Sequence, residues 1–165
     1  MQSVKFLGNI GHLIHRAGQQ ADELFTRSVG GSGLTARQLS VLATVAGLDH
    51  PSQTKLCAAT GIDRSTMADI VRRLVKRGWL TRRRTRQDAR TYAISLTIEG
   101  QRILHHVLPI ATTVDAALIS ELTIEEQEQF TSLLQTIVGH HRALLSSDDD
   151  QRPDPEFQTR VDGLG

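Results

Sequence analysis

The sequence has 165 residues, of which 39% are hydrophobic and 22% charged, a composition typical of a soluble globular protein that excludes collagen-like, mucin-like and wholly disordered chains. No apolar run approaches the roughly 18 uncharged residues of a membrane helix, and residues 1–9 lack the apolar core of a signal peptide, so we expect a cytoplasmic protein. The single cysteine, Cys57, excludes disulfide scaffolds and cysteine-built zinc sites.

Charge is distributed unevenly along the chain. The formal net charge is only +1, from 19 Lys and Arg against 18 Asp and Glu. Residues 64–90 hold ten basic and two acidic residues, a net charge of +8, which leaves −7 on the rest of the chain. Such polarisation favours a polyanionic partner approached in one orientation, and nucleic acid or an anionic membrane surface would fit.

The N-terminal part of the sequence predicts two helices. Apolar residues recur at steps of three and four over residues 4–28, which is typical of a long helix with a narrow apolar face. The glycine-rich segment 30–33 ends that helix. Thr35–Gln38 has the form of a capping box, so a second helix is expected over residues 36–47.

A helix, a tight turn and a second helix follow. Ser52 can cap a short apolar helix, and Gly61 supplies a residue that turns readily with positive φ. Asp63 is a good N-cap for a third helix, which Gly78 ends. That helix buries one apolar face and leaves its arginines exposed.

The remaining sequence predicts a hairpin and two helices. Residues 80–84 and 91–96 have the pattern of two short strands joined by a polar tip. Thr97 can cap a long helix, and a Thr-x-x-Glu capping box over residues 123–126 begins a last helix that runs to about Leu145. Residues 146–165 form an acidic tail that we expect to be disordered.

This order of elements is that of a winged helix-turn-helix domain, expected over residues 34–100 in a mainly α fold with a small β-hairpin. In the helix that begins after Asp63, the first turn would read base edges, and the arginines two turns later would meet phosphates or further bases. An arginine of the hairpin would enter a minor groove. Asp88 could orient a neighbouring arginine, favour the turn by bonding its own backbone, or do both. The alternative is a solvated helix face, but such faces usually mix both signs of charge, and here the helix carries one acid, Asp69. The candidate DNA contacts are Arg64, Ser65, Thr66, Arg72, Arg73, Lys76, Arg84, Arg86, Asp88 and Arg90.

Several separated motifs occur in order along the chain: Leu34-Thr35-Ala36-Arg37-Gln38, Gly61-Ile62-Asp63-Arg64-Ser65-Thr66-Met67, residues 71–80, Arg84 to Arg90 and Leu96-Thr97-Ile98-Glu99-Gly100. Together they resemble the MarR (multiple antibiotic resistance regulator) family of bacterial transcription factors. The resemblance implies a homodimer whose first and last helices interlace, which gives a helical dimerisation region over residues 1–30 and 101–145. It also implies that the dimer binds a pseudo-palindromic DNA site. It also implies that Asp88 and Arg90 form an Asp-x-Arg wing motif, and that a pocket accepts a phenolic or aromatic-acid effector.

The residues themselves suggest where such a ligand could bind. His12 and Arg16 lie one turn apart on the first helix and could meet an anion, with Phe25 or Trp79 as walls. The alternative is that Arg16 lies on the surface and Trp79 in the core.

Two sensor chemistries can be weighed against this prediction. The resemblance implies that peroxide sensing uses a cysteine in the first helix, which has none here. Histidines of the outer helices could hold zinc, but no Glu or Cys completes an obvious set, so we predict no metal and no cofactor. These are His12 and His15, His105 and His106, and His140 and His141.

The sequence therefore predicts a cytoplasmic, dimeric, sequence-specific transcriptional regulator that binds double-stranded DNA and no membrane. We expect a repressor released from its operator by a small aromatic or phenolic ligand. The alternative is an architectural protein that binds DNA without sequence preference or effector. No Gly-rich phosphate loop, nucleophile elbow or HExxH motif is present in the sequence, so we do not expect an enzyme.

Overall fold

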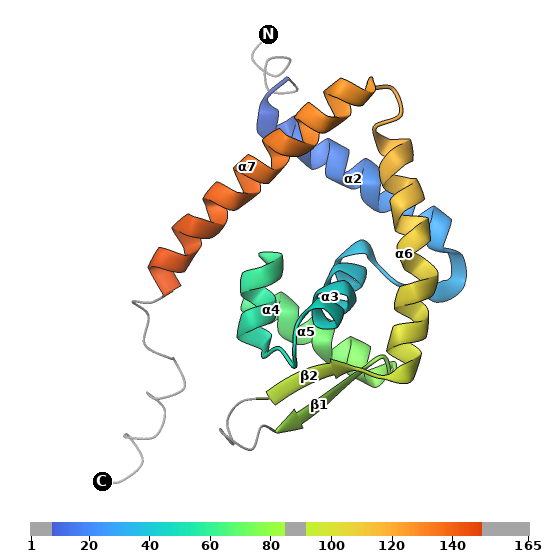
Figure 1. Ribbon diagram of the computed structural model, residues 1–165, viewed down its shortest axis with the longest axis vertical. Helices are drawn as coiled ribbons and strands as arrows, with labels where there is room; N and C mark the ends of the chain where they lie inside the picture. Colours follow the sequence, from blue (N-terminus) through green and yellow to red (C-terminus); the bar gives the residue numbers. More distant parts are fainter. Residues whose placement is uncertain (1–7, 85–91, 150–165) are drawn as a thin grey trace. The chain divides into compact units, whose positions relative to one another are not determined.

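The computed structural model describes residues 8–84 and 92–149, with side chains as far as Gly139. The elements, shown in Figure 1, are α2 (Ile10–Val29), the short helix η1 (Gly30–Ser32), α3 (Ala36–Gly47), α4 (Gln53–Thr60), α5 (Arg64–Lys76), β1 (Leu80–Arg84), β2 (Tyr92–Leu96), α6 (Ile98–Leu118) and α7 (Ile124–Asp149). The chain divides between Thr123 and Ile124 into two compact units, the second of which contains α7. None of the described helices is long and apolar enough to cross a membrane.

The predicted helix starts are confirmed by their capping contacts. Thr35 and Gln38 form both halves of the capping box at the start of α3. The side chains of Ser52, Asp63 and Thr97 each accept a hydrogen bond from a backbone N–H in the first turn of the helix that follows. These contacts satisfy donors that a helix N-terminus otherwise leaves without partners.

Two predicted boundaries are wrong. The N-terminal helix was expected from residue 4, but α2 begins at Ile10, because Gly8 and Asn9 form a turn and Asn9 is extended; residues 1–7 lie outside the described part. The last helix was expected to end near Leu145, but α7 continues to Asp149. A helix that has already formed adds further residues at low cost, even residues of modest propensity. The rest of the tail also lies outside the described residues.

The core of the first unit joins the helix-turn-helix to the hairpin and to α6. Helix α2 packs along α6, α3 contacts α4, α6 and β2, and α5 contacts β1. Side chains with less than 2% exposure come from nearly every one of these elements. The largest of these are Leu42, Leu56, Met67, Leu74, Leu80 and Ile94.

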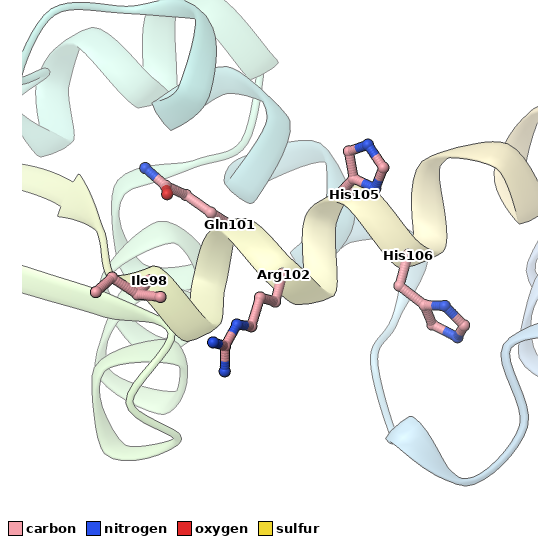
Figure 2. Close-up of a pocket in the computed structure, with 5 residues that line it drawn as sticks. All are labelled: Ile98, Gln101, Arg102, His105 and His106. Atoms are coloured by element: carbon pink, nitrogen blue, oxygen red, sulfur yellow. The ribbon is translucent and has the colours of Figure 1, made fainter.

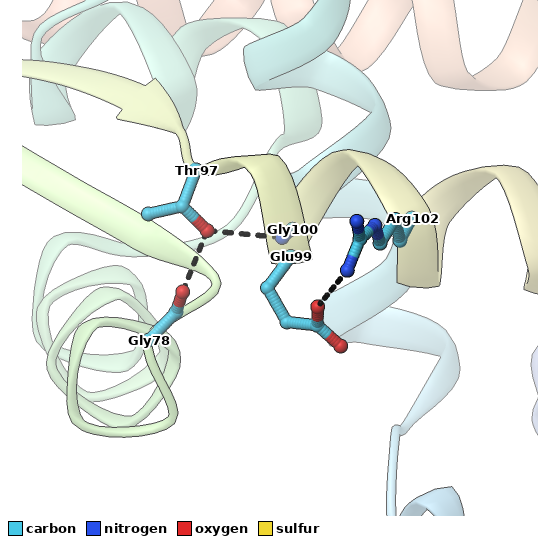
Figure 3. Close-up of polar contacts among 5 residues, drawn as sticks. All are labelled: Gly78, Thr97, Glu99, Gly100 and Arg102. Atoms are coloured by element: carbon cyan, nitrogen blue, oxygen red, sulfur yellow. Dashed lines mark hydrogen bonds and ion pairs between the residues drawn. The ribbon is translucent and has the colours of Figure 1, made fainter.

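A dense junction connects the hairpin to the start of α6. The Thr97 hydroxyl donates to the carbonyl of Gly78 at 2.6 Å and accepts from the N–H of Gly100 at 3.0 Å, as Figure 3 shows. The Thr97 N–H donates to the carbonyl of Trp79 at 3.1 Å. Gly100 packs directly against the Trp79 peptide, so this position leaves no room for a side chain.

Candidate nucleic-acid interface

Helix α5 begins with a hydrogen-bonded cluster around Asp63. The Asp63 carboxylate accepts from the backbone N–H of Thr66 at 2.9 Å and from the hydroxyl of Ser65 at 2.7 Å. These bonds, that of Ser65 foremost, hold the pKa of Asp63 far below its ordinary value. Because Ser65 gives its hydrogen to Asp63, its oxygen is left as an acceptor on an exposed position of the first turn. The exposed side chain of Arg64 lies beside it.

The centre of α5 carries an ion-pair cluster that was not predicted from the sequence. Asp69 Oδ1 pairs with Arg72 Nη2, and Asp69 Oδ2 lies 2.7 Å from Arg73 Nε. The hydrogen bond from Arg72 is the main cause of a lowered pKa at Asp69. Both arginines remain exposed, and Lys76 is exposed one turn further on. The i,i+3 and i,i+4 spacing could have suggested these pairs.

The hairpin holds two arginines against its tyrosine. Strands β1 and β2 pair antiparallel, and the register places Arg84 opposite Tyr92. Arg84 Nε donates to the Tyr92 hydroxyl at 3.2 Å, and the Arg82 guanidinium lies 4.6 Å from the ring centroid. The hydrogen bond between Arg84 and Tyr92 raises the pKa of Arg84 and lowers that of Tyr92. Arg82 also donates to the Gln53 side chain at 3.3 Å, which ties β1 to α4.

The tip of the hairpin lies outside the described residues. The predicted roles of Arg86, Asp88 and Arg90 therefore stay predictions. The described part of the hairpin carries three exposed arginines, Arg82, Arg83 and Arg84.

The four predicted ligand residues do not come together within the chain. His12 is half-buried and Arg16 exposed near the start of α2, whereas Phe25 lies 13 positions beyond His12, about 20 Å along the helix axis. Phe25 is buried in the core, and Trp79 packs against that core with the Arg77 guanidinium 4.9 Å from its ring centroid. Phe25 and Trp79 thus take part in packing, and a ligand-binding role for any of the four residues stays a prediction.

Two open hollows lie on the described surface. One runs along α6, where Figure 2 shows His105 and His106 pointing to different sides of the helix; its lining is Ile98, Gln101, Arg102, His105 and His106. The other lies beside the start of α5 and is lined by Arg37, Ser40, Thr60, Gly61, Ile62, Asp63 and Thr66. Within the described residues, no three His, Cys, Asp or Glu side chains converge as metal ligands.

Comparison with known proteins identifies a family with this architecture. The MarR family model matches residues 32–91. The transcriptional regulator HosA of Escherichia coli O157:H7 is 31% identical over 106 residues, which cover 64% of this chain and 78% of HosA.

Solved structures agree with this match. Bordetella bronchiseptica BpsR, described with the regulation of its DNA binding by 6-hydroxynicotinic acid, aligns with a TM-score of 0.76 and 27% identity over 81% of this chain and 95% of that one. A mutant of Escherichia coli MarR complexed with operator DNA aligns with a TM-score of 0.72 and 25% identity, covering 78% and 92% of the two chains. The fold is thus that of the winged helix-turn-helix regulators. Among them, the chain belongs to the MarR family.

Proposed function

We propose that this chain is a dimeric, sequence-specific DNA-binding transcriptional regulator, and specifically a repressor that a small aromatic or phenolic ligand releases from a pseudo-palindromic operator. The observation that carries the proposal is the exposed basic row on α5, backed by the arginines of β1 on the adjoining hairpin. A helix with an exposed polar face and a hairpin beside it match the two elements that such domains place on DNA. The MarR structure with operator DNA supports this reading.

In this proposal the side chains on α5 divide by position. The first-turn residues Arg64, Ser65 and Thr66 read bases. Arg72, Arg73 and Lys76 contact the DNA two to three turns later, and Arg84 adds a contact from the hairpin. Arg90, in the tip, enters the minor groove with Asp88 and Arg86 beside it, as the family's wing motif implies.

Exposed apolar residues support the dimer. On α2 the side chains of Ile10, Leu13 and Ile14 are all about half exposed or more. On α7, considered by itself, Phe130, Leu133, Ile137 and Val138 are exposed as well. Apolar rows of this kind on a soluble chain usually mark a protein interface.

The ligand part of the proposal rests on the relatives. BpsR is described as regulated by 6-hydroxynicotinic acid, an aromatic acid. His12 and Arg16 on α2 supply a candidate cationic end for such a ligand. Phe25 packs in the core and Trp79 against it, and their role as walls of the pocket stays a prediction.

The test is fluorescence anisotropy with a duplex selected by the protein from a random-sequence library, against a scrambled duplex at near-physiological salt, repeated with a panel of aromatic acids. We expect selective binding, lost on addition of one compound, and a dimer by light scattering. Removal of residues 1–28 should abolish tight binding although the basic residues remain. Equal affinity for both duplexes, unmoved by every compound, would instead establish the architectural alternative, with a steep salt dependence and no specificity.

A further inference from the structure

The acidic residue at the centre of α5 lies on the face that the proposed function turns toward DNA. Positions 65, 69, 72 and 76 are spaced by four, three and four residues, so they form one row along the helix. The buried side chains Met67, Ile70, Val71 and Leu74 occupy the opposite face. Asp69 therefore lies inside the row that begins with Ser65 and ends with Lys76.

A carboxylate at this place has an electrostatic cost. It repels phosphates, and it partly neutralises the two arginines that pair with it, so it weakens general attraction to DNA. An arginine that acts on a phosphate only through its positive charge gains little from being fixed by a carboxylate, because that attraction depends weakly on orientation. An arginine that reads a base edge does gain, because a bidentate contact needs its planar guanidinium in one orientation.

The contacts at Asp69 fix both guanidinium groups and still leave donors for a ligand. The two carboxylate oxygens serve different arginines: Oδ1 pairs with Arg72 Nη2, and Oδ2 with Arg73 Nε at 2.7 Å. Because Arg73 is held through Nε, its two terminal nitrogens stay available as a fork, the geometry that suits the O6 and N7 acceptors of guanine. The Arg72 and Arg73 side chains are 76% and 65% exposed, so a base edge could reach them.

We propose that Asp69 is a specificity-determining positioning residue, which orients Arg72 and Arg73 toward guanine edges in the major groove. The proposal rests on the proposed function, since it requires α5 to bind DNA. It assigns to Asp69 a role opposite in sign to that of its neighbours: it lowers affinity for DNA in general and raises the preference for the correct sequence.

The test compares Asp69→Asn with the unmodified protein on the library-selected duplex and on its scrambled control. We expect affinity for the scrambled duplex to rise, since a negative charge is lost, while the ratio of selected to scrambled affinity falls by about 5- to 150-fold, the range of one bidentate base contact. Glu99→Gln is the matched control, because it removes the same charge from an i,i+3 pair with Arg102 on α6. That control should leave the ratio unchanged. Far-UV circular dichroism should show both variants folded, because exposed ion pairs contribute little to stability.

A double-mutant cycle separates positioning from direct contact. If Asp69 acts through the arginines, Asp69→Asn should change the ratio little in a chain that already carries Arg72→Ala and Arg73→Ala. An undiminished effect in that background would overturn the proposal, because Asp69 would then act on its own. The proposal is also overturned if Asp69→Asn raises affinity for both duplexes by one factor. Failure of the proposed function is recognised separately, since the unmodified chain would then bind the two duplexes equally.

Discussion

Replacement of Gly100 by alanine tests the junction between the hairpin and α6. A Cβ built at this position overlaps the carbonyl oxygen of Trp79, lies 2.9 Å from the Trp79 carbonyl carbon and 3.2 Å from Leu96 Cδ2. Carbon atoms in ordinary contact are about 3.5 Å apart or more. The backbone of α6 and the Trp79 peptide must therefore separate by at least about 0.6 Å, because the main obstruction is backbone and cannot rotate away.

The magnitude follows from two effects. Forcing one extra carbon into a closed site typically costs about 1–3 kcal/mol. The separation also stretches the hydrogen bond from the Thr97 N–H to the Trp79 carbonyl, 3.1 Å long in the unmodified protein, whose loss costs about 1 kcal/mol. We expect Gly100→Ala to lower the free energy of unfolding by about 2–4 kcal/mol, a large share of the roughly 5–15 kcal/mol of a typical domain.

The assay is urea denaturation followed by circular dichroism at one fixed protein concentration, with a thermal melt as a second measure. A loss of this size corresponds to a fall in Tm of roughly 5–15 °C for a chain of this length. Gly47→Ala is the control, since Gly47 also lies in a helix but has open space around its Cβ position; we expect it to stabilise the protein by about 0.4–1 kcal/mol. If Gly100→Ala and Gly47→Ala unfold alike, the close approach of α6 to Trp79 is refuted.

Two further predictions concern ionisable groups. Tyr92 is the only tyrosine in the sequence, so a titration followed by phenolate absorbance reports this residue alone. The pKa of Tyr92 should lie below the ordinary value near 10 and should rise in Arg84→Gln. It should not rise in Arg83→Gln, because position 83 pairs with Ala93 instead. Equal midpoints in all three proteins would contradict the Arg84 contact. Because the folded-state pKa of Asp63 is depressed, its contribution to stability is present above the unfolded pKa of about 4 and is lost as the pH falls through the folded value. Asp63→Ala should therefore reduce the urea midpoint at pH 7, with a gap that narrows in acid, whereas a gap independent of pH would show that the carboxylate charge is not involved.

Local features of the fold could be predicted from the sequence because they depend on neighbours along the chain. The capping contacts of Thr35, Ser52, Asp63 and Thr97 involve residues within three positions, so the residue types alone indicated them. The buried face of α5 followed from helical periodicity in the same way. The start of α2 was placed too early because the apolar spacing continues through the Gly8–Asn9 turn, and periodicity does not register a turn.

The candidate site was less predictable because it depends on side-chain directions and strand register. The sequence marked Asp69 as the single acid of α5, but which arginines it holds depends on rotamers. The pairing of Arg84 with Tyr92 requires the register of a hairpin whose connecting loop has no diagnostic turn motif. The packing of Phe25 and Trp79 could not be told from the sequence, because an aromatic residue that lines a pocket and one that packs in a core look alike there.

The hairpin is attached on two sides through backbone atoms, and this has a mechanical consequence. On one side the Ile94 N–H donates to the carbonyl of Pro51 before α4 at 3.0 Å, and on the other the Thr97 N–H donates to the carbonyl of Trp79. Backbone groups cannot change rotamer, so a displacement at the start of α6 must either move the base of the hairpin or break the bond between Thr97 and Trp79. Gly100 is also in direct contact with the Trp79 peptide, so α6 cannot move closer to this peptide without a clash. The start of α6 and the base of the hairpin are therefore joined through backbone contacts, so a displacement of one strains its contacts with the other.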